Sequence, residues 1–372
     1  MIINKAVGIV FSNIHDQDVP ELTSNRTLAS VPFGGRYRLI DFTLSNMASS
    51  GISKVGIITK NNYQSLMDHV GSGKSWDLSR KNGGLIVLPP YAEARTIYNT
   101  RYEAIKGILT FIKRCSEDYV VMSDCDNVCN FDYDAVIRYH IERCADITAI
   151  YRRRAYDVDT SRPHTLMTIG EDGRVTKVQE GDKRHSGEQC FYTNMLVISR
   201  KFLLGILDES THYTSFSRDV MSKTNEYRIY GYELTGYYSC IDSLASYYRH
   251  SLELLRKENR DLLFKKENGA RILTKIRDSA PLRIENGAKV NNSIIADGCV
   301  IEGEVKNSVI FRGVRVAKGA IVSNSIVMQD VSVSAGSSLN ACIVDKNAII
   351  LDKRTLSGHS THPYFIAKNA VI

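Results

Sequence analysis

The sequence has 372 residues, a formal net charge of +7 at pH 7, 43% hydrophobic residues and 24% charged residues. A chain of this length can form two domains, each with its own core. It has neither an apolar run of the roughly 20 residues that a membrane span needs nor a signal peptide, and no basic stripe with interleaved aromatic residues. We therefore expect a cytoplasmic protein that binds neither membranes nor nucleic acid. The eight cysteines lack the paired spacing of a zinc site, which predicts free thiols.

Residues 1–260 alternate β-rich segments with helical ones. Short runs rich in β-branched residues predict strands over 6–11, 55–59, 118–122 and 147–151. Apolar residues at helical spacing predict helices over 101–114, 131–143 and 246–259. Strands that alternate with helices of about 10–15 residues are typical of a largely parallel sheet covered on both faces. The sequence therefore predicts an α/β domain in this region.

The loop after the first strand has an unusual composition for such a domain. Nucleotide-binding loops at this place carry glycines, so that backbone N–H groups can approach and face the phosphates. Residues 12–23 contain no glycine, lysine or arginine, and they contain the acids Asp16, Asp18 and Glu21. Both the backbone and the charge are therefore unsuited to an anion.

The rhythm changes in the C-terminal part of the chain. The phrase Asn-Ser-aliphatic begins at Asn292, Asn307 and Asn324 and returns loosely at Asn340, with an aliphatic residue about every fifth or sixth position. A repeat this short cannot bury a hydrophobic face alone, which favours the stacked coils of a parallel β-helix over an irregular β-sandwich. We place a linker over 261–285 and the β-helix over 286–372. The exposed strand edges of a β-helix make this domain the better candidate for oligomerisation.

Several long phrases resemble the ADP-glucose pyrophosphorylases (glucose-1-phosphate adenylyltransferases) of bacterial glycogen synthesis. These phrases follow one another in the same order, at residues 33–42, 44–46, 50–52, 71–78, 80–84 and 88–90. The resemblance implies a Rossmann-like (GT-A-like) nucleotidyltransferase domain, a left-handed β-helix and a tetramer. It also implies a reaction in which glucose-1-phosphate attacks the α-phosphorus of ATP with the help of Mg²⁺ and basic groups.

The chain departs from the family pattern at the residues that perform this chemistry. Residues 11–18 keep nothing of the glycine-rich GGxGTRL phrase, and Leu28 stands where the family has a lysine. Of the two metal-binding aspartates, Asp126 is retained and the second is replaced by Cys240, a poor ligand for Mg²⁺. Asp242 is two residues further on, and alternation or helical rotation should point it elsewhere. Asp126 is thus the only retained ligand, and we expect no metal.

The sugar-phosphate clamp has changed in the same direction. Glu180 is kept, but the lysine that follows it in the family is Gly181 here, and the family's Gly-Thr-Ala-Asp-Ala phrase has become residues 100–104. Asp126 and Glu180 are therefore interpreted as vestiges, and no functional catalytic residue is expected.

This combination resembles the non-catalytic D-type (GlgD-type) subunits of two-component ADP-glucose pyrophosphorylases. The leading hypothesis is a regulatory subunit that modulates a catalytic homologue within a heterotetramer, with self-association also open. Such a chain needs no cofactor of its own, and Mg²⁺ belongs to the catalytic partner.

Two alternatives stay open. Asp126 and Glu180 leave room for a divergent but active sugar-1-phosphate nucleotidyltransferase. Arg26 and Arg38 match arginines of the family's sugar-phosphate activator site, which favours a sugar-phosphate-sensing module, although the neighbouring lysine of the family is Asn25 here.

Overall fold

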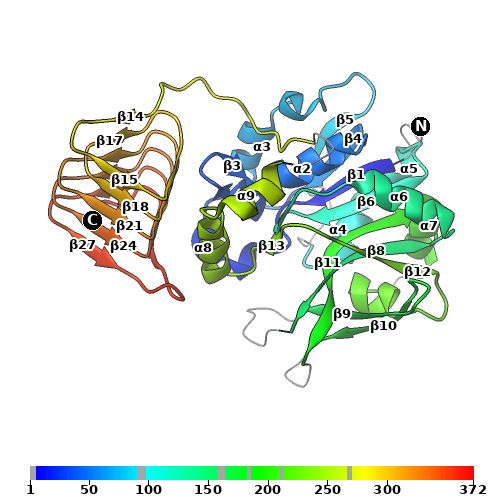
Figure 1. The fold of residues 1–372 in the computed structure, drawn as a ribbon. Helices are drawn as coiled ribbons and strands as arrows, with labels where there is room; N and C mark the ends of the chain where they lie inside the picture. Colours follow the sequence, from blue (N-terminus) through cyan, green and yellow to red (C-terminus); the bar gives the residue numbers. More distant parts are fainter. Residues whose placement is uncertain (1–5, 90–97, 157–163, 182–185, 210–212, 266–269) are drawn as a thin grey trace.

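The computed structural model describes residues 6–89, 98–156, 164–181, 186–209, 213–265 and 270–372. Its N-terminal part is an α/β domain that ends with α9, and its C-terminal part is a β-helix that begins with β14 (Figure 1). The strands of the N-terminal part are β1 (Ala6–Phe11), β2 (Pro32–Phe33), β3 (Tyr37–Arg38), β4 (Lys54–Ile58), β5 (Gly84–Leu88), β6 (Tyr119–Asp124), β7 (Asn127–Cys129), β8 (Ile147–Ala155), β9 (Thr165–Ile169), β10 (Val175–Glu180), β11 (Glu188–Ser199), β12 (Ile229–Glu233) and β13 (Tyr238–Cys240). Its α-helices are α1 (Pro20–Thr23), α2 (Leu39–Ser49), α3 (Gln64–Val70), α4 (Arg101–Gly107), α5 (Leu109–Arg114), α6 (Tyr133–Glu142), α7 (Arg200–Glu209), α8 (Leu244–Glu253) and α9 (Lys257–Phe264).

The central sheet combines a parallel half with an antiparallel half. β5, β4, β1 and β6 are parallel neighbours in that order. β11 pairs antiparallel with β6, and β8, β9 and β10 extend the sheet beyond it. The predicted parallel sheet is therefore confirmed around β1, whereas the predicted strand at 147–151 belongs to the antiparallel half as part of β8.

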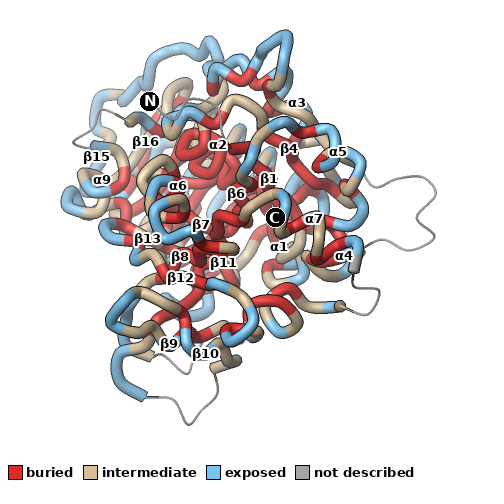
Figure 2. Tube along the Cα trace, turned by 90° about the vertical axis from the view of Figure 1, so that its right-hand side faces the viewer, coloured by how far each residue is buried: buried red, intermediate tan, exposed pale blue. Residues whose placement is uncertain are grey.

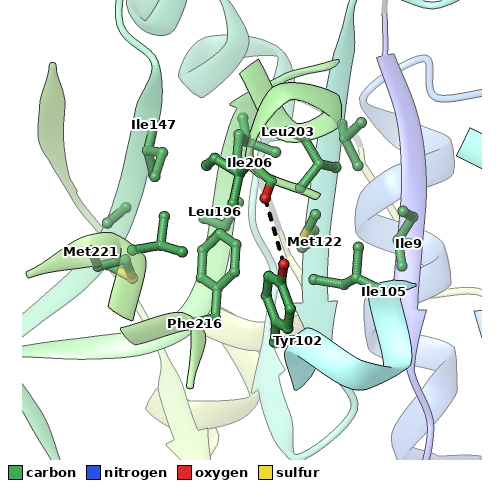
Figure 3. Packing of buried hydrophobic residues seen from close by; sticks show 14 of the residues in the cluster. Ile9, Tyr102, Ile105, Met122, Ile147, Leu196, Leu203, Ile206, Phe216 and Met221 are labelled. Atoms are coloured by element: carbon green, nitrogen blue, oxygen red, sulfur yellow. Dashed lines mark hydrogen bonds between the residues drawn. The ribbon is translucent and has the colours of Figure 1, made fainter. Parts of the chain in front are cut away.

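Both faces of the sheet are covered, as the sequence predicts. Along β1, Ile9 packs into one hydrophobic cluster with α4, α5 and α7, whereas Val10 packs into a second cluster with α2 and α6. Figure 2 shows the buried residues concentrated along β1, β6, β8 and β11. Figure 3 shows the first cluster, in which Tyr102 and Ile105 of α4 lie beside Ile9 and Met122.

Two predicted helices are each divided in two. The helix predicted over 101–114 breaks at Ile108, which follows Gly107 and has φ −110° and ψ 18°. The helix predicted over 246–259 is interrupted between Glu253, the last residue of α8, and Lys257, the first residue of α9. Arg256, the N-cap of α9, has an extended conformation. Apolar spacing alone does not reveal such breaks, since both halves continue the same amphipathic pattern.

The C-terminal part consists of three parallel sheets that share the coils of a β-helix. Each sheet contains five strands, in the orders β14-β17-β20-β23-β26, β15-β18-β21-β24-β27 and β16-β19-β22-β25-β28. The strands are β14 (Arg283–Ile284), β15 (Lys289–Asn291), β16 (Ile294–Ile295), β17 (Val300–Ile301), β18 (Glu304–Lys306), β19 (Val309–Ile310), β20 (Arg315–Val316), β21 (Ile321–Ser323), β22 (Ile326–Val327), β23 (Ser332–Val333), β24 (Ser338–Asn340), β25 (Cys342–Val344), β26 (Ile349–Ile350), β27 (Thr355–Ser357) and β28 (Tyr364–Ile366).

The repeated asparagines form one corner of this β-helix. Asn292, Asn307 and Asn324 have φ values of 41°, 48° and 48°, in the left-handed region that asparagine tolerates better than most residues. Their side-chain amides donate from coil to coil, from Asn292 to Asn307 (2.8 Å), from Asn307 to Asn324 (3.2 Å) and from Asn324 to Asn340 (2.9 Å). The repeated phrase therefore encodes both the turn and an asparagine ladder across the coils.

The two ends of the β-helix differ. At the C-terminal end the tail folds back, and the N–H of Leu351 donates to the carbonyl of Ile372 (2.7 Å). At the N-terminal end, β14, β15 and β16 form the outer edges of their sheets, and the inward-facing Ile284 and Val290 remain 50% and 38% exposed. Their neighbours in the next coil, Ile301 and Val305, are buried. We call this N-terminal end the open end.

The β-helix packs against the N-terminal domain through its third sheet. Val309, Ile326 and Ile343 of that sheet belong to one buried cluster with Phe33 and Tyr247 of the N-terminal domain. Among the helices that the structure describes, none combines the length and the apolar character that crossing a membrane requires. Each of the eight cysteines is described and is a free thiol, as predicted.

Candidate functional site

Four side chains gather at the carboxyl edge of the parallel strands, where open α/β sheets bind their ligands. Asp124 is the last residue of β6, and Asp126 follows it in the turn into β7. His15 lies in the loop after β1. Cys240 ends β13, which pairs with β7 and so brings the thiol beside Asp126. The structure therefore brings together the two positions, 126 and 240, that the resemblance assigns to metal binding.

The charged groups of this centre are in direct contact. Both carboxylates are buried, and Asp124 Oδ2 lies 2.8 Å from His15 Nε2 and 2.5 Å from Arg101 Nη2. Asp126 Oδ2 lies 3.9 Å from His15 Nε2 and accepts from Cys240 Sγ at 3.5 Å. Burial alone would raise the pKa of Asp124, but Arg101 and His15 hold that pKa below its ordinary value. The centre is thus held by internal ion pairs.

The side chains of the loop after β1 bond to neighbouring parts of the protein. Ser12 Oγ donates to the carbonyl of Ile58 (2.7 Å), and Asp16 Oδ1 accepts from the N–H of Leu28 (2.8 Å). Because Asp16 is largely buried, its pKa is raised to about 7. The loop therefore carries a carboxylate in the place where a phosphate loop presents donors.

Leu28 is part of the hydrophobic core. It is 2% exposed and shares a cluster with Val31, Phe33 and Tyr247. The replacement predicted from the sequence thus puts an aliphatic side chain into a dry environment, where a lysine would carry an uncompensated charge.

Glu180 and Gly181 lie at the end of β10, outside the charged centre. Glu180 is exposed, and the N–H of Gly181 donates to the carbonyl of His164 (2.8 Å). A Cβ atom on Gly181 would lie 2.9 Å from the Tyr156 hydroxyl oxygen and 3.0 Å from Tyr156 Cε2. Tyr156 therefore fills the space into which a side chain at position 181 would project.

Asp242 does not join the charged centre. It lies before α8, and its Oδ1 accepts from Ser243 Oγ at 3.2 Å. In the described part of the chain, the group whose ligand atoms all lie within 4.8 Å of one another consists of His15, Asp124 and Asp126. Asp242 is not a member of this group.

A cavity of about 240 Å³ opens beside the charged centre. Its wall is rich in hydroxyl, amide and imidazole groups, from Ile14, His15, Asn99, Thr100, Arg101, His164, Thr165, Tyr192, Thr193, Asn194, Thr214, Ser215, Phe216, Ser217, Tyr238 and Cys240. Arg101 is the one lining residue with a permanent charge, and that charge is engaged by Asp124. The cavity is therefore polar but has no free basic group on its described wall for a triphosphate.

A second cavity, of about 320 Å³, lies between the N-terminal domain and the β-helix. Its wall is strongly basic and includes Arg36, Arg38, Lys275, Arg277, Arg312, Lys346 and Lys368, against the single acid Asp330. We call it the basic cavity. Arg38 Nη1 is fixed by the carbonyl and the hydroxyl of Ser65, at 2.6 and 2.9 Å.

Arg26, the other effector candidate, does not line the basic cavity. It is 3% exposed, and its Nη2 forms an ion pair with Asp345 Oδ2 of the β-helix at 2.5 Å. Arg36 lies in the phrase at 33–42, whereas the other lysines and arginines of the cavity come from the linker and from different coils of the β-helix. No local motif connects residues so distant in the sequence.

Both parts of the chain match known protein families. Residues 19–256 match the family model described as nucleotidyl transferase, and residues 281–361 match the GlmU-like C-terminal hexapeptide model. The glucose-1-phosphate adenylyltransferase of Bacillus mycoides is 32% identical over 94% of this chain and 93% of its own length. The glycogen biosynthesis protein GlgD of Bacillus subtilis is 30% identical over 99% of this chain and 97% of its own length.

The chain belongs to the glucose-1-phosphate adenylyltransferase (ADP-glucose pyrophosphorylase) family. Its architecture, a Rossmann-like nucleotidyltransferase domain followed by a left-handed β-helix of hexapeptide type, is confirmed. The resemblance derived from the phrases at 33–52 and 71–90 is confirmed with it.

The metal that this family's reaction uses does not fit the residues present. Mg²⁺ prefers carboxylate and water oxygens in octahedral geometry, and Cys240 offers a thiol instead. Asp124 Oδ2 already accepts from His15 and Arg101, so a metal would have to displace one of these donors. The three-residue group around Asp126 is close enough to share a cation, and Arg101 already forms an ion pair with Asp124 within it.

Proposed function

We propose that this chain is a regulatory, largely non-catalytic subunit of an ADP-glucose pyrophosphorylase complex in glycogen biosynthesis. The observation that carries the proposal is the charged centre, in which Asp124 is bound by Arg101 and His15 while Cys240 faces Asp126. The loop after β1 supports it, because it contains a buried carboxylate at Asp16 instead of phosphate donors. A retained fold around a neutralised centre suits a chain that acts on a catalytic homologue.

The direct test is co-expression with a catalytic family member that carries the intact GGxGTRL loop. We expect the two chains to purify together and the complex to differ from the catalytic chain alone in kcat or in its response to sugar-phosphate effectors, with Mg²⁺ supplied to the partner's site. Absence of a complex, or a complex with unchanged kinetics, would reject the proposal.

The competing enzyme hypothesis is tested on the isolated chain. Asp126 and Glu180 are retained, so a divergent nucleotidyltransferase predicts formation of ADP-glucose from ATP and glucose-1-phosphate in Mg²⁺. We expect no turnover above that of a sample without the protein. A rate that survives removal of all catalytic homologue would instead favour the divergent enzyme.

The open end of the β-helix supports a contact with another chain. Ile284 and Val290 expose apolar area next to unpaired strand edges, a combination that favours association. We expect Ile284→Asp to weaken complex formation at least tenfold in analytical ultracentrifugation. Ile321→Asp, at a similarly exposed position on β21, is the control and should leave association unchanged. Equal effects of both changes would exclude the open end.

A second function, sensing of a sugar phosphate without turnover, is favoured by the basic cavity. Seven basic side chains against one acid create a site for a multiply charged anion. Calorimetry with fructose-1,6-bisphosphate tests this, on the chain alone and in complex. Arg277→Ala and Lys368→Ala should each weaken binding several-fold, whereas Lys306→Ala, on an exposed strand outside the cavity, should not. If neither sample shows a heat of binding, sugar phosphates are excluded as ligands of the basic cavity.

A further inference from the structure

The charged centre contains a positive group that the family pattern does not predict. Asp124 Oδ2 accepts both Arg101 Nη2, at 2.5 Å, and His15 Nε2, at 2.8 Å. Asp126 lies in the same group, with its Oδ2 3.9 Å from His15 Nε2. The side chains of Asp124 and Asp126 are 1% and 0% exposed, so the charge that balances them has to lie inside the protein, where Asp124 Oδ1 and Arg101 Nε are buried without a hydrogen-bond partner among the described residues.

Arg101 is held in place by the element that carries it. It is the first residue of α4, and Thr100 before it caps the helix by accepting from the N–H of Glu103 at 3.2 Å. Tyr102 after it is buried in the core, where its hydroxyl donates to the carbonyl of Ile206 at 3.5 Å (Figure 3). The Arg101 guanidinium also lies 5.5 Å from the centre of the Phe11 ring. The residues on either side of Arg101, Thr100 and Tyr102, therefore fix the position of its backbone.

We propose that Arg101 is the resident cation of this centre, and that its guanidinium takes over the charge-balancing place that a divalent metal has in catalytic members of the family. This inference rests on the proposed non-catalytic function and gives it a physical basis. By the resemblance, the family's Gly-Thr-Ala-Asp-Ala phrase corresponds to residues 100–104, so its threonine corresponds to Arg101.

The energetics of burial support the exchange. A buried carboxylate without a partner costs several kcal/mol, and removing one member of a buried pair leaves that cost unmet. A guanidinium keeps its charge at all accessible pH values, so it balances the carboxylates without an exchangeable ion. When Arg101 is removed, the centre must recruit another cation or lose stability.

The test measures binding of Mn²⁺, a spectroscopically visible substitute for Mg²⁺, to the isolated full-length chain. The wild-type chain and Arg101→Lys, which keeps a cation, should bind no Mn²⁺ in electron paramagnetic resonance titrations and melt at the same temperature in EDTA and in millimolar Mn²⁺. Arg101→Thr should melt several degrees lower in EDTA, bind one equivalent of Mn²⁺ and recover most of the loss in Mn²⁺.

The double variant Arg101→Thr/Asp124→Ser removes both charges and serves as the second arm. It should fold with nearly wild-type stability and should not bind Mn²⁺. This arm can be measured even when the Arg101→Thr variant does not yield folded protein. Binding of one equivalent of Mn²⁺ by the wild-type chain, a folded Arg101→Thr variant that binds none, or an unstable double variant would each overturn the proposal. No partner or turnover enters the measurement, so its failure is distinguishable from failure of the regulatory function.

Discussion

The protonation of Lys346 depends on the positive charge of the basic cavity that it lines. Burial, together with the neighbouring Arg38 and Arg26, lowers the pKa of its ammonium group to about 7. Between pH 7 and the ordinary lysine pKa of about 10.4, the unfolded chain holds a proton at this residue that the folded chain has released. Stability therefore falls as the pH decreases through this interval and levels off below it.

We predict that Lys346→Met stabilises the protein without ligand. At pH 7.5 the gain in the free energy of unfolding should be on the order of 1–3 kcal/mol. The reason is that the wild-type lysine must be buried with its charge or lose its proton on folding, and methionine avoids this cost. An anion in the basic cavity favours the protonated lysine, so anion affinity of the wild-type chain should rise as the pH falls through 7, and the variant should lose much of that dependence. Urea unfolding and calorimetry at pH 6 and 8 measure both effects.

The exposed Lys368 of the same cavity provides the control for this prediction. Lys368→Met should reduce anion affinity without raising stability. Equal stabilisation by the two changes would mean that general charge repulsion, and not the burial of Lys346, sets the balance.

At the scale of single residues, replacements inside a known phrase were easier to predict from the sequence than new contacts between distant residues. Leu28, Gly181 and Cys240 could be predicted because each replaces a residue inside a phrase whose place in the chain is known. The pairing of Asp124 with Arg101 and His15 could not, because these residues are 23 and 109 positions apart and meet only through the fold.

The asparagine ladder shows how one residue type specifies an element. Asn307 accepts from Asn292 and donates to Asn324, and its φ of 48° keeps the chain turning at the corner. The side chain and the backbone therefore contribute separately to the β-helix, and two substitutions can separate them.

We predict that Asn307→Ala lowers the free energy of unfolding by about 2–3 kcal/mol, since it removes two hydrogen bonds and puts an alanine into the left-handed region. Asn307→Gly removes the same bonds but accepts this backbone conformation, so it should cost about 1 kcal/mol less. Urea unfolding followed by circular dichroism compares them. Identical losses would show that the backbone conformation contributes nothing, and two neutral variants would refute the ladder's role.

The element scale also shows why some features were predictable and others were not. The β-helix was predictable because its stacking repeats in the sequence, with asparagine at the corner of three coils, although Ala341 takes the corresponding corner of the next one with φ 50°. The breaks at Ile108 and before Lys257 were not, because tertiary packing decides them while the apolar spacing continues.

The whole molecule depends on a buried connection between its two parts. Arg26 and Asp345 form an ion pair with side chains only 4% and 3% exposed, beside the cluster that joins the β-helix to the N-terminal domain. Lys346, the next residue, lines the basic cavity. The contact between the two parts and the walls of the cavity are thus built from the same segment.

We predict that Arg26→Met costs about 3–5 kcal/mol of stability, because it leaves Asp345 charged and buried without its partner. The double variant Arg26→Met/Asp345→Leu should regain most of this loss. Arg80→Met is the matched control, since the exposed Arg80–Asp77 pair should contribute at most about 1 kcal/mol. Urea unfolding and protease sensitivity of the segment at 270–282 measure the effects. If Arg26→Met lowers the free energy of unfolding no more than Arg80→Met does, the buried pair has no stabilising role.

The space that Tyr156 takes at Gly181 limits which residues position 181 can accept. A lysine at position 181 would place its Cβ 2.9 Å from the Tyr156 hydroxyl oxygen, so the Tyr156 side chain would have to move to accept it. At position 28 a lysine would enter a filled core, and at position 101 a threonine would strand a buried acid. The surroundings of positions 28, 101 and 181 therefore fit the residues that this chain carries, and each of these single changes would require its neighbours to rearrange.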